Sequence, residues 1–72
     1  MQVSIITPNK YHQVIINTLQ ASKFYKLTAK TTDTDTITVV YDGTENNDYV
    51  FNHIRNLFWN YTNYRYPMQF VI

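Results

Sequence analysis

The chain of 72 residues contains no cysteine and a single glycine, Gly43. Without cysteine, neither a disulfide framework nor a thiolate metal site can reinforce a small core. A phosphate-cradling loop of the P-loop or Rossmann kind needs several glycines, so neither loop can form. The chain also has only one glutamate, Glu45, and therefore no glutamate pair for glycoside chemistry. These absences exclude enzymes that depend on a thiolate metal site, on a glycine-rich phosphate-binding loop or on a pair of glutamates.

Long hydrophobic runs are also absent. The longest uninterrupted aliphatic run covers residues 14–16, whereas a membrane-spanning helix needs about 20 apolar residues. Residues 1–7 contain no basic segment followed by a long apolar one, so no secretory signal is predicted. We therefore expect a cytoplasmic protein, inside the host cell if the gene is viral, with no membrane partner.

The residues that are present favour a folded domain. Hydrophobic residues make up 44% of the chain and charged residues 15%, a balance unlike that of a disordered tail. The length allows one small domain, so we expect a single α+β domain over residues 1–72. Residues with AT-rich codons, including seven tyrosines and four phenylalanines, far outnumber those with GC-rich codons. This bias indicates a gene from a low-GC bacterium, its phages or plasmids, or some eukaryotic viruses.

The first quarter of the chain predicts a strand and a helix. Over Gln2–Ile6, β-branched residues nearly alternate with polar ones, which is typical of a short strand. Thr7 and Pro8 then provide a capping residue and a proline suited to the first helical position, so a helix is expected from Pro8 to about Ser22. Its stripe at helical spacing comprises Tyr11, Val14, Ile15, Thr18, Leu19 and Ser22.

The middle of the chain predicts a hairpin. Phe24–Thr32 and Thr36–Asp42 both alternate as strands, and the polar residues 31–35 between them suit a turn. Asp42, Gly43 and Thr44 end the second strand, and Gly43 is the residue at which a positive φ would cost least.

The last third predicts a second helix and a final strand. The helix should run from about Glu45 to Asn60, with Thr44 or Asn46 as its cap. Its apolar stripe comprises Val50, Ile54, Leu57, Phe58 and Tyr61. Tyr64–Ile72 alternates as a strand, and Pro67 within it predicts an edge position or a bulge.

The predicted order of elements is therefore β-α-β-β-α-β, the ferredoxin-like split βαβ pattern. This pattern implies an antiparallel sheet of four strands with both helices on one face. A βαββα core with the last segment detached is the alternative.

No set of residues suits catalysis or metal binding. His12 and His53 lie in different predicted helices, without the spacing of a zinc site. Asp33 and Asp35 could suggest a site for a hard cation such as calcium. They lie, however, in a threonine-rich turn, where aspartate is favoured for capping alone. Ser4 and Ser22 lack the surroundings of a nucleophile. We therefore expect neither an enzyme nor a cofactor.

Nucleic-acid binding through the open face of the sheet is one functional hypothesis, because RNA-recognition sheets stack bases on exposed rings. The alternation, however, places five aromatic residues on the helix-covered face: Tyr25, Tyr41, Tyr64, Tyr66 and Phe70. The open face is expected to carry Ser4, Ile6, Lys26, Thr28, Lys30, Thr36, Thr38, Val40, Arg65 and Gln69. Lys26, Lys30 and Arg65 would form a mildly basic patch. A one-residue slip of strand register would turn the tyrosines outward.

Protein binding is the preferred hypothesis. Trp59 lies one position outside the apolar stripe of the second helix, and Phe51 and Phe24 are not fully accounted for by it. Exposed aromatic and arginine side chains are common interface anchors, so we predict contact residues Trp59, Phe51, Tyr49 and Arg55.

The sequence thus predicts a small non-enzymatic module, encoded by a phage or other mobile element, that occludes a host protein. The expected targets are a defence nuclease, a transcription component or a replication component. Two alternatives stay open: the nucleic-acid-binding module, and a structural subunit that forms a homodimer or larger assembly through an edge strand.

Overall fold

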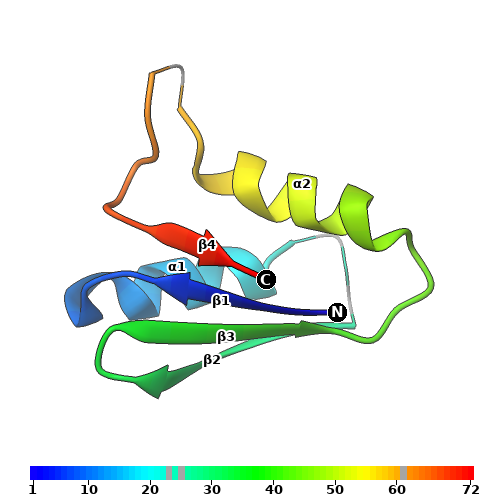
Figure 1. Cartoon of the computed structure of the whole chain (residues 1–72), viewed down its shortest axis with the longest axis horizontal. Helices are drawn as coiled ribbons and strands as arrows, with labels where there is room; N and C mark the ends of the chain where they lie inside the picture. The colour runs from blue at the N-terminus through cyan, green and yellow to red at the C-terminus, as the bar shows by residue number, and fades with distance from the viewer. Residues whose placement is uncertain (23, 25, 61) are drawn as a thin grey trace.

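A computed structural model describes residues 1–22, 24, 26–60 and 62–72. The elements in chain order are β1 (Gln2–Ile6), the 3-10 turn η1 (Asn9–Tyr11), α1 (His12–Gln20), β2 (Leu27–Asp33), β3 (Thr36–Tyr41), α2 (Asn47–Phe58) and β4 (Gln69–Val71). The four strands form one sheet in the order β2-β3-β1-β4, with every neighbouring pair antiparallel (Figure 1). The predicted α+β class is confirmed.

One face of the sheet and the two helices share a single core. Alternate strand residues turn toward the helices, as the period of two requires, and they are buried together with the helix stripes. The core residues shared in this way include Val3, Ile5, Ile37 and Val39 from the strands, Ile15 and Leu19 from α1, and Val50, Ile54 and Phe58 from α2. Each such side chain contributes about 1.5–3 kcal/mol on burial. Neither helix within the described ranges has the length and apolar character needed to cross a membrane.

The start of the first helix was predicted wrongly. Pro8 has an extended backbone (φ −56°, ψ 144°), and η1 precedes α1, which begins only at His12. Thr7 does not cap the helix, because its hydroxyl donates to the carbonyl of Pro67 at 2.7 Å. A contact with a residue 60 positions away in the sequence therefore replaces the local cap. The helix also ends at Gln20, two residues before the predicted end at Ser22.

The second helix is close to the prediction. It covers Asn47–Phe58 rather than residues 45–60, and Asn46 is its cap, accepting from the N–H groups of Asp48 (2.9 Å) and Tyr49 (3.2 Å). Leu57 is only partly buried, and the predicted stripe residue Tyr61 lies outside the described residues.

The hairpin is confirmed with shifted ends. β2 begins at Leu27 rather than Phe24, and its register with β3 shifts between Thr31 and Asp33. Gly43 does not use the positive φ that glycine allows. Glycine is needed there for a different reason, because a Cβ at this position would overlap the ring of Tyr41.

The final strand is shorter than predicted. β4 covers only Gln69–Val71, not Tyr64–Ile72, and it lies at an edge of the sheet beside β1. Pro67 has no amide to donate to a ladder, and its carbonyl binds Thr7. Of the residues before Pro67, Tyr66 instead packs on Tyr11 of η1, with 5.1 Å between ring centroids, and the hydroxyl of Tyr64 accepts from Arg55 of α2.

Candidate protein-binding surface

Trp59 lies directly after α2 as its C-cap residue, with an extended backbone (φ −76°, ψ 127°). Its side chain is 48% exposed. The indole meets the ring of Tyr64 edge to face, with 5.0 Å between centroids and 81° between planes. The two residues also form an isolated antiparallel bridge. Trp59 is therefore a half-exposed ring that the rest of the chain holds in place.

The chain reverses between Trp59 and Tyr64 through a turn stabilised by asparagine side chains. Asn60 Oδ1 accepts from the N–H groups of Thr62 (3.0 Å) and Asn63 (2.8 Å). Asn63 Oδ1 accepts from the N–H of Tyr64 at 2.8 Å. Asparagine favours such turns because its side chain bonds backbone groups one to three residues further on. The reversal brings Tyr64 back beside the end of α2.

Arg55 connects the aromatic rings of this region. Its Nε donates to the hydroxyl of Tyr64 at 3.3 Å, and its guanidinium lies 5.6 Å from the centroid of the Phe51 ring. Phe51 and Tyr64 both contact Phe70 of β4, at centroid distances of 6.1 and 5.4 Å. We call these five residues, Phe51, Arg55, Trp59, Tyr64 and Phe70, the aromatic surface.

A hollow of about 130 Å³ opens in the aromatic surface between Arg55, Asn56, Trp59 and Tyr64. Its walls combine two aromatic rings with a guanidinium group and an amide. Tryptophan, tyrosine and arginine are the residue types that contribute most at protein interfaces. The hollow can therefore receive an apolar or hydrogen-bonding side chain from another protein.

The structure brings three of the four predicted contact residues together. Phe51 and Arg55 lie four residues apart on one flank of α2, and Trp59, the C-cap residue four positions further on, donates its N–H to the carbonyl of Arg55 at the end of that flank. Tyr49 is also 48% exposed, but it lies on the other flank, where its ring meets Phe24 at 5.9 Å.

Tyr64 and Phe70 belong to the aromatic surface but were not predicted as contact residues. The alternation over residues 64–72 predicts both on the helix-covered face of one long strand. The asparagine pair Asn60 and Asn63 is the signal that marks a turn there instead. Phe24 is a core residue rather than a ring available for a contact. The helical stripe did not account for it, but it is buried against Tyr41, at 5.8 Å between ring centroids.

The predicted basic patch is divided between the two edges of the sheet. Lys30 lies on β2, and Lys26 directly precedes it. Arg65 lies in the segment before β4, and its N–H donates to the carbonyl of Phe58 at 2.8 Å. Because β2 and β4 are the outermost strands, the three cations do not form one patch.

The open face of the sheet is rich in threonine. Thr28 donates to the carbonyl of Val40 at 3.5 Å, and the hydroxyls of Thr32 and Thr38 lie 2.8 Å apart. Tyr41 is buried on the helix side, as expected, while Tyr25 lies outside the described residues. Among the described strand residues, this face carries no aromatic ring on which a base could stack.

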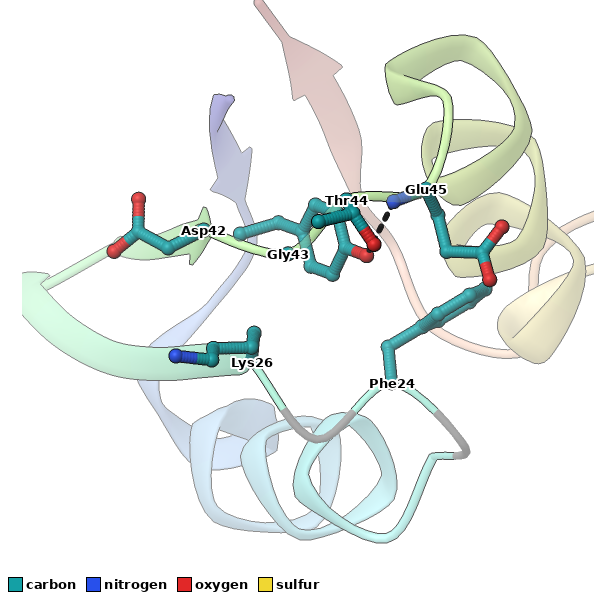
Figure 2. A pocket seen from close by; sticks show the side chains of 7 residues that line it. Phe24, Lys26, Asp42, Gly43, Thr44 and Glu45 are labelled. Carbon is teal, nitrogen blue, oxygen red and sulfur yellow. Dashed lines mark hydrogen bonds between the residues drawn. The ribbon is translucent and has the colours of Figure 1, made fainter.

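A larger hollow of about 330 Å³ lies near the other end of α2, lined by Phe24, Lys26, Tyr41, Asp42, Gly43, Thr44 and Glu45. Figure 2 shows Lys26 and Asp42 on one side of it and Phe24 and Glu45 on the other. The hydroxyl of Tyr41 accepts from the N–H of Glu45 at 3.0 Å, which fixes the chain between β3 and α2. This hollow combines charges of both signs around a structural hydrogen bond.

His12, the first residue of α1, is buried. It is 4% exposed, with Nε2 2.9 Å from the carbonyl of Thr7 and Nδ1 3.0 Å from the hydroxyl of Thr31. A carbonyl only accepts, so Nε2 carries a proton, and in the neutral ring Nδ1 accepts from the Thr31 hydroxyl. His12 therefore links α1 to β2 and to Thr7, the residue after β1.

Comparisons with protein-family models, with curated proteins and with solved structures found no match.

Proposed function

We propose that this chain is a non-enzymatic protein-binding module and that the aromatic surface contacts its partner. The observation that carries the proposal is Trp59, a large ring that is 48% exposed and yet held by Tyr64. Ordering a loose side chain on binding costs about 0.5–1.5 kcal/mol. A ring that is already fixed avoids that cost, and the neighbouring Arg55 and Tyr64 supply hydrogen-bonding groups.

The proposal extends to the fold, role and origin. The strand order β2-β3-β1-β4, with both helices contributing to one core, supports assignment to the ferredoxin-like split βαβ fold. That fold alone implies no function. The AT-rich residue usage supports a phage or mobile-element gene whose product occludes a host nuclease, transcription or replication component.

The test is a tagged pull-down from nuclease-treated lysate of a low-GC bacterium, repeated with two alanine variants. We expect Trp59→Ala to weaken binding of the retained protein at least about 30-fold, equivalent to about 2 kcal/mol, as for an interface hot spot. Tyr49→Ala is the matched control, because Tyr49 has the same exposed fraction but lies on the other flank of α2. Circular dichroism checks that both variants fold.

Two outcomes contradict the proposal. One is a partner that Trp59→Ala and wild type retain equally. The other is recovery of nucleic acid alone when nuclease is omitted, with an affinity that falls steeply with salt and with Lys30→Ala; that result favours the nucleic-acid-binding module.

A further inference from the structure

The two edges of the sheet differ in how well they are protected against strand addition. β2 carries Lys30 and a register shift between Thr31 and Asp33, and both features disfavour pairing with another strand. The segment around β4, residues 66–72, has no charged side chain. Val71 and Ile72 are 45% and 82% exposed. β4 is therefore the edge at which strand addition is favoured.

The hydrogen bonds of β1 show which backbone groups of β4 are available. Met1 and Tyr41 exchange two bonds, and Thr7 N–H donates to Asp35, so the odd-numbered residues of β1 bond β3. In an antiparallel ladder the even-numbered residues then bond the strand on the other side. Ser4 and Ile6 therefore bond their β4 partners, residues 71 and 69. Phe70 lies between these two, so its N–H and C=O point away from β1, toward the open edge.

The flank of α2 beside this edge has a symmetrical charge pattern. Asp48, Phe51 and Arg55 are spaced by three and four residues, so they lie along one flank of the helix. Phe51 is close to Phe70, with 6.1 Å between ring centroids. Along the helix, the flank therefore presents an acid, then an aromatic ring near β4, then a base.

We propose that a second copy of the chain binds this edge, pairing its β4 antiparallel to the first about a two-fold axis beside Phe70. In this arrangement the two Phe70 residues exchange both backbone hydrogen bonds, and Met68 of each copy faces Ile72 of the other. Both α2 helices lie on the same face of the joined sheet and run antiparallel. Asp48 of each copy then faces Arg55 of the other, with the two Phe51 rings between these ion pairs.

Charge complementarity selects a second copy as the occupant. An isologous contact requires each surface to match its own rotated image. An acid and a base on either side of a central ring meet this requirement, because reversing the helix places each charge opposite its counterpart. The edge of β2 lacks such a pattern, because pairing centred on Lys30 would place two cations opposite each other.

The dimer goes beyond the proposed function and does not depend on it. In the dimer, Arg55 faces Asp48, which lies at the start of α2 in the other copy. Trp59 lies four residues beyond Arg55 and therefore extends past the end of that helix. Phe51, Arg55 and Phe70 of the aromatic surface would then lie in the dimer interface, whereas Trp59 and Tyr64 would stay accessible to a partner protein on each copy. Loss of the dimer in a variant can then be measured without any knowledge of a partner protein.

The first test measures mass and amide exchange over a range of chain concentrations. Light scattering is expected to give twice the chain mass of 8.6 kDa at high concentration. The amide of Phe70 should exchange rapidly in the monomer and become protected as the dimer forms. A chain that stays monomeric up to about 1 mM, at the weak end of specific affinities, overturns the proposal. So does a dimer in which the Phe70 amide stays unprotected.

Charge reversal tests the pairing of the helices. Asp48→Arg and Arg55→Asp should each weaken the dimer about tenfold, because each change places like charges opposite each other. A mixture of the two variants, or the double variant, should restore it. Asp33→Arg and Lys30→Asp, on the edge strand β2, are matched controls that should leave the dimer unchanged. Failure of the mixture to restore the dimer contradicts the helix contact.

A further variant tests the strand contact without touching the monomer core. Ile72→Asp should abolish the dimer, because the side chain of Ile72 is exposed in the monomer and would face Met68 of the second copy. Val14→Asp, which changes another exposed aliphatic residue, should have no effect on the dimer. Equal dimerisation by both variants is the result that rejects pairing through β4.

Discussion

Among single residues, Gly43 is under a tight packing constraint. A Cβ at this position would overlap the buried ring of Tyr41, whose hydroxyl holds the N–H of Glu45. Gly43→Ala is expected to lower the free energy of unfolding by about 1–3 kcal/mol, because the ring must shift. Urea denaturation measures the change. Thr44→Ala, at the exposed next residue, should change stability by less than about 0.5 kcal/mol; similar values for the two variants contradict the packing argument.

His12 is a second residue at which a local change should affect the whole core. His12→Leu removes the donor to the carbonyl of Thr7, a residue that is itself buried. An unpaired buried polar group costs about 1–3 kcal/mol, and we expect that loss in the free energy of unfolding. Thr31→Val removes the partly buried bond at the other ring nitrogen but keeps the fully buried bond to Thr7, so it should cost less. The midpoints of urea denaturation of the two variants test this order, and the reverse order would show that the Thr7 bond is unimportant.

At the scale of elements, the start of α2 depends on one side chain. Asn46 Oδ1 accepts two of the N–H groups that the first turn of the helix leaves unpaired. Asn46→Ala should therefore destabilise the protein by about 0.5–2 kcal/mol. Asn47→Ala, one position further on, is the control and should be close to neutral. Thermal unfolding followed by circular dichroism distinguishes the two, and equal midpoints would mean that the cap contributes nothing.

Elements determined by local pattern were predictable from the sequence, whereas their ends often were not. β1 and the stripe of α2 follow from periodicity, and Asn46 from capping preference. The start of α1 was predicted at Pro8, four residues too early, because the hydroxyl of Thr7 binds the carbonyl of Pro67 instead of capping the helix. β4 is short because the turn at Asn60 and the proline at position 67 remove its first half. Long-range hydrogen bonds of this kind leave no periodic signal.

The candidate site was predictable to the same limited extent. Phe51 and Arg55 share a helix flank and Trp59 lies at its end, which helical spacing alone can show. Tyr64 and Phe70 join them only because the chain reverses after Trp59 and then adds a strand beside β1. Assigning these two rings to the surface therefore required the tertiary structure. The burial of His12 likewise depends on segments that meet only in the folded chain.

For the molecule as a whole, stability should be greatest at the centre of the sheet. β1 and β3 have neighbours on both sides, while β2 and β4 each have one. Amides of Ile5 and Val39, buried in the core, should therefore exchange most slowly, and the amide of Val71 faster. Hydrogen exchange at low chain concentration, where any dimer is dissociated, measures this order. Slower exchange at Val71 than at Ile5 would contradict it.

The central position of β1 has a consequence for synthesis of the chain. β1 is made before the other elements of this fold, yet its neighbours are β3 and β4, and Ser4 pairs with both Thr38 and Val71. While the ribosome is still adding residues, α1 and the hairpin of β2 and β3 can form from nearby segments, but one side of β1 stays without its strand until β4 has emerged. The last step of folding must close a loop of more than 60 residues, which slows it. Until β4 has paired, the sheet therefore stays unfinished and the apolar strand β1 is open to chaperones.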